Sequence, residues 1–520
     1  MPLYLTQGLH RAVQQHPRRT ATICGPRQHS YAQYADRVAK LAGALQALGM
    51  ARGDRIGMLS LNSDRYLEFY FGTWWGGGAV NPVNIRWSAA EIAYSLDDCE
   101  TRILLVDEQF KAVGLDLRSR SKVLQTLVYV GDGETPEGML DYEAIVAAAA
   151  PVADAARSGQ DLAGVMYTGG TTGFPKGVML THDSLCANAL SALGEGLTEA
   201  SGRALLIAPM FHIACAALML AHAAAGGTFI IAPMFTPLGT LQVIQAQRVT
   251  HLMLVPTMIQ LATDHPDAAQ YDLSSVQVMS YGGSVISEGV LQRAMKRFPG
   301  ADFVQAYGMT ELSPCATYLS FADHKSEAAK TGLLRSAGRA SLTTEVRVVD
   351  PLGVEVPRGT VGEVAVRGAN VMLGYWNKPE QTAAALRDGW MHTGDGGRMD
   401  DDGYLYIVDR MKDMIVSGGE NVYSAEVENA LSQHPAVAAC AVIGIPSDEW
   451  GESVHAVVVC KPGASATTKQ LADHCRQLIA GYKCPRSTEF RDALPMTGAG
   501  KILKTELRKP YWEGRTREVN

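Results

Sequence analysis

The chain has 520 residues, of which 47% are hydrophobic and 19% charged, and its formal net charge is −7. This length exceeds what one compact core accommodates, so we expect two or more domains of ordinary globular composition. The acidic balance argues against a nucleic-acid-binding protein, because no excess of basic residues is available to neutralise phosphates. The nine cysteines are scattered without a C-x-x-C pair. They favour a reduced cytoplasmic compartment and argue against a thiolate metal site.

The first part of the chain has the pattern of a parallel sheet covered by helices. Residues 1–20 contain no uninterrupted apolar core, so we expect no signal peptide. Apolar positions recur at helical spacing up to residue 47, starting after Ser30, which is a candidate N-cap. Short apolar runs alternate with helical patterns and predict buried strands at 55–59, 102–106 and 126–130.

The middle of the chain repeats one pattern, in which an apolar run ends in a cluster of glycine, proline or polar residues. The most apolar run beyond the N-terminus, residues 214–231, contains His222 and a Gly-Gly pair, which favours a buried helix and strand over a membrane span. Ligands bind beyond the carboxyl ends of parallel strands, so we expect the clusters to line one crevice. Simple strand-to-helix turns are the alternative. The clusters lie at 209–212, 256–260, 281–284 and 307–311.

After about residue 340 the pattern becomes that of antiparallel strands. Residues 344–368 alternate with Gly/Pro turns, and residues 401–410 predict a hairpin. The acidic residues 400–402 lack the spacing of a calcium loop, so we expect a solvated turn there. The segment from about 412 predicts a small α+β domain. Its expected helices are 424–434 and 468–480, and its expected strands are 436–445 and 453–460.

The stretch YTGGTTGFPKGV, at residues 167–178, has the composition of a loop that holds phosphates. Small residues let backbone N–H groups approach an anion closely, and threonine hydroxyls add further donors. Lys176 supplies a mobile positive charge that suits a triphosphate. The spacing differs from that of the G-x-x-x-x-G-K-[ST] loop of nucleotide hydrolases, so another reaction is indicated.

This loop and six further motifs resemble those of the adenylate-forming superfamily, which comprises acyl-CoA synthetases, nonribosomal-peptide adenylation domains and luciferases. The order and spacing of the motifs fit over essentially the whole chain and come closest to fatty-acid and aryl-acid CoA ligases. The further motifs are PMFH at 209–212, YGG at 281–283, YGMTE at 307–311, HTGD at 392–395, IVDRMKDMIVSGGENVY at 407–423 and PMTGAGKILK at 495–504.

The resemblance implies an α/β fold with two domains. Residues 1–410 are expected to form a large domain of layered, parallel-rich sheets with helices, together with a small barrel-like β part that binds the acid and ATP. Residues 411–520 are expected to form a small, mobile α+β domain that carries the catalytic lysine.

The family chemistry joins a carboxylate to the α-phosphate of ATP and releases pyrophosphate, so two negative reactants must be held together and their charge screened. By resemblance, the catalytic residues are Lys501, Thr171, Glu311 and His212, and both Glu311 and Thr171 hold Mg²⁺. The other implied contacts to ATP and coenzyme A are Thr168, Gly169, Gly170, Thr172, Gly173, Lys176, Gly282, Gly283, Ala306, Tyr307, Gly308, Thr310, Asp395, Ile407, Arg410, Ser417, Gly418 and Gly419.

The resemblance also assigns individual roles within this set. Tyr307 is expected to stack on adenine, and Asp395 to accept hydrogen bonds from the ribose hydroxyls, with Arg410 nearby. Gly169 stands where many members of the superfamily have serine. We interpret this as a tolerated change, because a backbone N–H can still donate to a phosphate oxygen. Lys501 is expected to bridge the carboxylate and the α-phosphate while negative charge develops there.

The resemblance further implies that the small domain rotates between the two half-reactions. The expected hinge is Lys412. One orientation delivers Lys501 for adenylation, and the other places residues 417–419 beside the tunnel for the CoA thiol.

The acid is expected to be a fatty acid of medium or long chain, or an aryl acid. Amino-acid-activating members place an aspartate where this chain has His212, and an imidazole suits a plain carboxylic acid better; a buried structural histidine is the alternative. The expected pocket walls are small and uncharged, which argues against a dicarboxylate. The pocket residues are His212, Tyr281, Gly282, Gly283 and Met309.

Three functions remain open at this point. The principal interpretation is an ATP-dependent acid:CoA ligase with small-molecule partners, no nucleic acid and no integral membrane segment. The alternatives are a stand-alone enzyme that loads a carrier protein and a catalytically silent nucleotide-binding protein. No carrier-domain motif follows Lys501 and no Ser-Lys-Leu ending is present, and a homodimer is left open.

Overall fold

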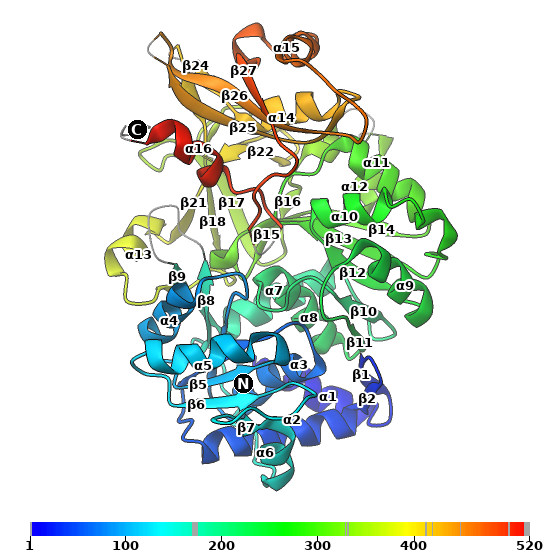
Figure 1. The fold of residues 1–520 in the computed structure, drawn as a ribbon, viewed down its shortest axis with the longest axis vertical. Helices are drawn as coiled ribbons and strands as arrows, with labels where there is room; N and C mark the ends of the chain where they lie inside the picture. Colours follow the sequence, from blue (N-terminus) through cyan, green and yellow to red (C-terminus); the bar gives the residue numbers. More distant parts are fainter. Residues whose placement is uncertain are drawn as a thin grey trace.

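The computed structural model shows a large N-terminal part with the small C-terminal part at one end of it (Figure 1). Within the described residues, no helix combines the length and the apolar character that a bilayer span requires. Arg410 is described in its backbone only. The described ranges are 3–168, 175–327, 329, 332–410, 413–418, 420–447, 449–497 and 500–513.

An eight-stranded sheet, mostly parallel, has the order β19-β9-β8-β4-β3-β5-β6-β7. The strands predicted at 55–59, 102–106 and 126–130 are confirmed as β3, β5 and β6. The strands are β3 (Arg55–Leu59), β4 (Ala79–Pro82), β5 (Ile103–Val106), β6 (Thr126–Tyr129), β7 (Leu140–Asp141), β8 (Leu162–Thr168), β9 (Lys176–Thr181) and β19 (Gly374–Tyr375). The helices of this region are α2 (Tyr31–Ala47), α3 (Asp64–Trp75), α4 (Ala89–Asp98), α5 (Lys111–Arg120) and α6 (Tyr142–Ala148).

A nine-stranded sheet has the order β16-β15-β14-β13-β12-β10-β11-β1-β2, and its central strands are parallel. The apolar run at 214–231 is confirmed as a helix and a strand, α8 and β11. The strands are β1 (Thr20–Cys24), β2 (Arg27–Ser30), β10 (Arg203–Leu206), β11 (Thr228–Ile231), β12 (His251–Leu254), β13 (Val278–Gly282), β14 (Asp302–Gly308), β15 (Cys315–Leu319) and β16 (Arg339–Ala340). The helices are α1 (Gln7–Gln15), α7 (His182–Gly194), α8 (Ile213–Ala225), α9 (Pro237–Gln247), α10 (Pro256–Thr263), α11 (Glu288–Arg297) and α12 (Phe321–Lys325).

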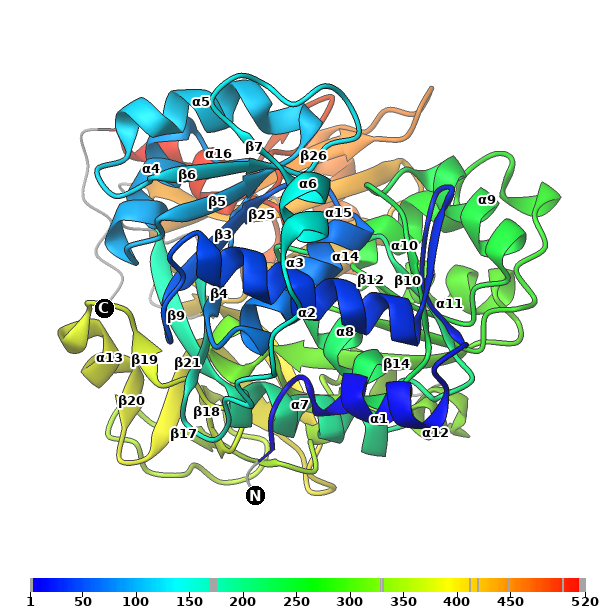
Figure 2. The ribbon, with the colours of Figure 1, turned by 90° about the horizontal axis from the view of Figure 1, so that it is seen from below.

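The two sheets share a layer of helices between them. Seen from below, α2 crosses the large part of the molecule and packs against α3 (Figure 2). Ser30 caps α2, as predicted, by accepting a hydrogen bond from the Gln33 N–H. Every residue of α3 is buried, because this helix has a sheet on either side of it. Along β10, Leu206 joins the cluster of this central layer, whereas Leu205 joins a separate cluster with α9, α10 and α11.

The antiparallel region and the small part complete the fold. The antiparallel pattern predicted at 344–368 is confirmed by the β17–β18 pair, and Asp400 accepts hydrogen bonds from the Asp402 and Tyr404 N–H groups in the predicted turn. The strands of this five-stranded half-barrel are β17 (Thr344–Val349), β18 (Gly362–Gly368), β20 (Leu386–Arg387), β21 (Trp390–Met399) and β22 (Leu405–Arg410), with α13 (Pro379–Ala385) beside them.

The small C-terminal part is an α+β unit with hydrophobic clusters of its own. Among the described residues, these clusters contain none that precedes Ile415. The boundary at 410/411 stays a prediction. The elements are β23 (Ile415–Ser417), β24 (Glu420–Val422), β25 (Val437–Ser447), β26 (Gly451–Cys460), β27 (Ser487–Phe490), α14 (Ser424–Ser432), α15 (Thr468–Arg476) and α16 (Lys504–Trp512).

Candidate active site

The loops after β13 and β14 begin side by side at one edge of the nine-stranded sheet. Gly282 pairs with Ala306 in the parallel register. A Cβ at Gly282 would lie 2.2 Å from the Ala306 carbonyl oxygen, so this approach requires glycine. Gly283 has a φ of 82°, which also favours glycine. The clusters at 281–284 and 307–311 therefore lie at one edge, as expected from the sequence.

Tyr307 and Asp395, the expected adenine and ribose contacts, are joined directly. The Tyr307 hydroxyl donates a hydrogen bond to Asp395 Oδ2 at 2.7 Å. Asp395 lies on β21, where Arg410 of β22 is its cross-strand partner and Ile407 lies opposite Gly397. The predicted nucleotide-binding residues of the half-barrel thus meet the end of β14.

Glu311 lies in a short 3-10 helix, η3 (Thr310–Leu312), and is only 5% exposed. The Tyr375 hydroxyl donates to its Oε1 at 2.8 Å. Within the described residues, no lysine, arginine or histidine forms an ion pair with Glu311. A buried carboxylate without a cationic partner is costly, and Mg²⁺ prefers oxygen ligands. Glu311 therefore fits the role of a magnesium ligand.

Lys176 lies at the far end of the predicted phosphate loop. It pairs with Thr168 across the antiparallel β8–β9 ladder, so the two residues flank the loop. Its ammonium lies 4.9 Å from the centroid of the Tyr375 ring. Tyr375 in turn pairs with Val178 of β9 through its backbone. A single tyrosine therefore contacts both the loop lysine and Glu311.

Seven of the expected site residues lie outside the described residues, and so does the side chain of an eighth. The seven are Gly169, Gly170, Thr171, Thr172, Gly173, Lys412 and Gly419, and the eighth is Arg410.

His212 caps α8 and is held in one neutral form. Its Nδ1 accepts a hydrogen bond from the Ala214 N–H at 3.2 Å, so the proton of the neutral ring lies on Nε2. Burial, and secondarily the charge of Lys501, lower the pKa of His212 to about 3. At neutral pH this side chain is therefore an uncharged hydrogen-bond donor.

Lys501 reaches the same edge of the sheet from the small domain. A Cβ added at Gly283 would lie 3.6 Å from Lys501 Cε. Lys501 is held in a tight turn, in which the Thr497 N–H donates to the Lys501 carbonyl at 2.6 Å. The large part holds this turn from two sides: Arg86 donates to the Thr497 carbonyl at 2.9 Å, and Thr257 donates to the Gly500 carbonyl at 3.3 Å. The red segment before α16 accordingly descends toward the large part (Figure 1).

The predicted CoA loop is packed within the small part. Arg486 donates to Ser417 Oγ at 2.9 Å, and the guanidinium lies over the Trp450 ring. The Gly418 N–H donates to the Trp450 carbonyl, and its φ of 63° favours glycine. The structure therefore shows the orientation in which these residues are packed inside the small part. In the same orientation Lys501, from the same domain, lies beside His212 and Gly283.

The remaining expected pocket residues differ in how their side chains are used. The Tyr281 hydroxyl hydrogen-bonds to His324 Nε2 at 2.8 Å, and its ring packs in the cluster that contains α10 and α11. Met309 is partly buried against the central cluster. A Cβ added at Gly308 would lie 2.0 Å from the Pro314 carbonyl oxygen, so glycine is required there. Their roles in acid binding stay predictions.

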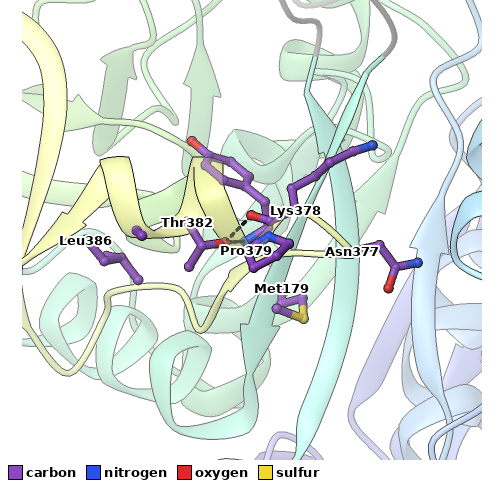
Figure 3. A pocket seen from close by; sticks show the side chains of 8 residues that line it. Met179, Asn377, Lys378, Pro379, Thr382 and Leu386 are labelled. Carbon is purple, nitrogen blue, oxygen red and sulfur yellow. Dashed lines mark hydrogen bonds between the residues drawn. The ribbon is translucent and has the colours of Figure 1, made fainter.

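A cavity of about 410 Å³ lies between β9 and α13 (Figure 3). In it, the Thr382 hydroxyl donates to the Lys378 carbonyl. None of the expected site residues lines this cavity. Its lining residues are Met179, Tyr375, Asn377, Lys378, Pro379, Thr382, Ala383 and Leu386.

Comparison with known proteins assigns the family. The family of AMP-binding enzymes matches residues 9–376, and the C-terminal domain of AMP-binding enzymes matches residues 426–501. The chain is an AMP-binding enzyme.

Two relatives and one solved structure are similar to it over nearly their whole lengths. A feruloyl-CoA synthase from Amycolatopsis sp is 41% identical over 96% of this chain and 98% of its own. A fatty acid–[acyl-carrier-protein] ligase, ScoC, from Streptomyces coeruleorubidus is 35% identical over 98% of this chain and 96% of its own. Among solved structures, the anthranilate CoA ligase AuaEII in complex with anthranoyl-AMP has a TM-score of 0.92 at 27% identity, covering 99% of this chain and 98% of that one.

Reasoning from the sequence missed several residues of this AMP-binding enzyme. Tyr375 was not singled out, because its partners Glu311 and Lys176 lie far from it in the sequence. Thr257 follows β12 in one of the clusters noted in the sequence, but nothing indicated that it would contact Gly500. Such contacts join distant segments, and only the packing of the domains reveals them.

Proposed function

We propose that this AMP-binding enzyme is an ATP-dependent aryl-acid:CoA ligase that works through an acyl-AMP. The observation that carries the proposal is the position of Lys501 beside Gly283 and His212. A lysine from one end of the chain meets the edge of the sheet where the expected ATP and acid contacts lie. The similarity to a feruloyl-CoA synthase supports an aryl acid, in the class of hydroxycinnamates.

In the first half-reaction, a carboxylate oxygen forms a bond to the α-phosphorus of ATP, and the bond from this phosphorus to pyrophosphate breaks. Lys501 and Lys176 supply positive charge to the negative reactants, which otherwise repel each other. Tyr307 and Asp395 hold the nucleoside. His212 is neutral, so it can donate from Nε2 without adding charge.

The residues present fit a bound Mg²⁺. Glu311 would hold it, together with Thr171 of the phosphate loop, because both offer oxygen. When bound, Mg²⁺ screens the charge of the phosphates and of the departing pyrophosphate.

In the second half-reaction, the CoA thiolate forms a bond to the acyl carbonyl carbon, and AMP leaves as the carbon–oxygen bond of the anhydride breaks. Lys501 is not needed for this step. We propose that the small domain rotates about Lys412 to present residues 417–419 to the thiol.

The experiment measures pyrophosphate release across a panel of acids, with and without CoA. The panel holds ferulate, coumarate, benzoate, anthranilate, octanoate and palmitate. We expect CoA-dependent turnover with thioester product to be fastest with hydroxycinnamates. Faster turnover with octanoate or palmitate would reject an aryl acid as the substrate but would still support an acid:CoA ligase.

Two other outcomes correspond to the alternatives. A burst of pyrophosphate that CoA does not accelerate, without thioester, would indicate an enzyme that loads a carrier protein; ScoC gives this alternative its support. No release with any acid would indicate a silent nucleotide-binding protein.

A further inference from the structure

A buried chain of polar contacts joins the start of α16 to the end of β22. Lys504, the first residue of α16, donates from Nζ to Ser424 Oγ at 2.5 Å and forms an ion pair with Glu428 Oε1 at 2.7 Å. Ser424 then donates to Asp409 Oδ2 twice, from its hydroxyl at 2.6 Å and from its backbone N–H at 2.5 Å. The chain therefore runs from Lys504 through Ser424 to Asp409.

The contacts are sheltered from water and charge-assisted. Ser424 is 0% exposed and Asp409 is 7% exposed. Burial alone would lower the pKa of Lys504, but Glu428 and Asp409 together hold it above its ordinary value, so the amine stays charged. Charge-assisted hydrogen bonds in such surroundings are stronger than neutral ones.

These contacts also join two different bodies of the fold. Asp409 lies on β22, whose partner β21 belongs to the half-barrel of the large part. Ser424 and Lys504 begin α14 and α16, whose Val427 and Leu507 pack in the hydrophobic clusters of the small part. The expected hinge, Lys412, lies between Asp409 and Ser424 in the chain. A rotation about this hinge would move Ser424 relative to Asp409, and the two bonds to Asp409 belong to the present orientation.

The present orientation is also the one that delivers Lys501. Lys504 follows Lys501 by three residues and begins the helix into which the Lys501 turn leads. Arg86 and Thr257 hold that turn on the large part by hydrogen bonds to backbone carbonyls, and Gln260 of α10 donates to the Ala438 carbonyl of β25. The chain from Lys504 to Asp409 adds a buried, charge-assisted tie between the base of the same segment and the large part.

We propose that Lys504 is a positioning residue for adenylation, which through Ser424 and Asp409 holds the small domain in the orientation that inserts Lys501. The inference rests on the proposed two-step reaction. Lys504 makes no contact with substrate in this role. Lys504 acts on the balance between the two orientations of the small domain. Loss of this chain favours the orientation for thioester formation.

The test compares the half-reactions in Lys504→Met and Asp409→Asn. Single-turnover pyrophosphate release reports adenylation, and conversion of supplied acyl-AMP with CoA reports the second step. We expect adenylation to slow about tenfold or more, as for loss of a hydrogen bond to a charged group, and the second step to be unchanged or faster. Equal losses in both steps would show that the cluster only stabilises the small domain, which also carries residues 417–419, and would overturn the proposal.

Arg491→Gln is the matched control, because Arg491 pairs with Glu489 inside the small part and makes no bond to β22 among the described residues. It should leave both half-reactions at the wild-type rate. If Lys504→Met does not fold, Asp409→Asn decides, since it alters only the large-part end of the chain.

A readout without catalysis separates this inference from the proposed function. Hydrogen exchange of the peptide 495–503 in the ATP-bound enzyme should be faster in Asp409→Asn than in Arg491→Gln, because the Lys501 turn is released from the large part. Equal exchange would overturn the inference even if the enzyme is a ligase. Faster exchange in Asp409→Asn, together with a wild-type enzyme that activates no acid, would keep the orientation effect and reject the proposed function.

Discussion

The hydroxyl of Tyr375 donates a hydrogen bond to Glu311 Oε1 at 2.8 Å, and the face of the same ring lies beneath the ammonium of Lys176. Tyr375 comes from the short strand β19, which pairs with β9 at the exit of the phosphate loop. One side chain thus sets the spacing between the expected magnesium ligand and the lysine of the phosphate loop.

Tyr375→Phe should weaken the use of magnesium while leaving Lys176 in place. The ring that supports Lys176 is kept, but the carboxylate of Glu311 loses the donor that orients it. We expect the Mg²⁺ concentration for half-maximal adenylation to rise about tenfold, with the same shift in a calorimetric titration of ATP at varied Mg²⁺. Tyr31→Phe, which also removes one buried hydroxyl bond, to Gly227, is the control. An unchanged magnesium requirement would mean that Tyr375 does not orient Glu311.

Lys501→Ala should abolish most acyl-AMP formation, because the site loses the ammonium that stabilises the developing charge. A loss of about 100-fold or more is expected for removal of such a group. Conversion of supplied acyl-AMP to the thioester should be largely spared. The check is the ratio of the two half-reaction rates, and near wild-type adenylation would refute the role assigned to Lys501.

Lys412→Pro should slow the second half-reaction much more than the first. Proline fixes φ, and a residue that absorbs the torsion change of a domain rotation cannot then do so. Transient kinetics should show acyl-AMP accumulating in the presence of CoA. Equal slowing of both steps would argue against a hinge at this position.

His182→Leu should make the protein less sensitive to acid. His182 begins α7, is 1% exposed, and neither of its ring nitrogens has a hydrogen-bond partner among the described residues. Burial lowers the pKa of His182 from 6.5 to about 4. Between these two pH values the unfolded chain binds more protons than the folded one, so the free energy of unfolding falls as the pH falls through this window.

The leucine variant removes this proton uptake. At pH 7 its free energy of unfolding should be at least that of the wild type and at most about 1 kcal/mol higher, because two unpaired buried nitrogens are lost. Thermal unfolding at pH 7 and pH 5 measures both effects. The same loss of stability between pH 7 and pH 5 in variant and wild type would contradict the assignment to His182.

The expected elements were found close to their predicted bounds where a local signal specifies them. The helix after Ser30 is an example, since its cap and its apolar spacing are both local. The last helix predicted, at 468–480, ends earlier, with Arg476 as the last residue of α15. Helix ends depend on what satisfies the final carbonyls and on nearby packing, so periodicity alone places them less well than helix centres.

The sequence by itself determined the reaction class, because the motifs for phosphate, ribose, metal and lysine each occupy one short segment and each requires particular residue types. It also predicted the helix after Ser30, the strands β3, β5 and β6, and the antiparallel pair β17–β18. The tertiary structure decided which distant groups meet: Tyr375 with Glu311 and Lys176, Lys501 with Gly283, and Lys504, through Ser424, with Asp409. The reason is physical. A hydrogen bond or an ion pair depends on distance in space, and residues far apart in the chain acquire that distance only when the sheets and the two domains pack together.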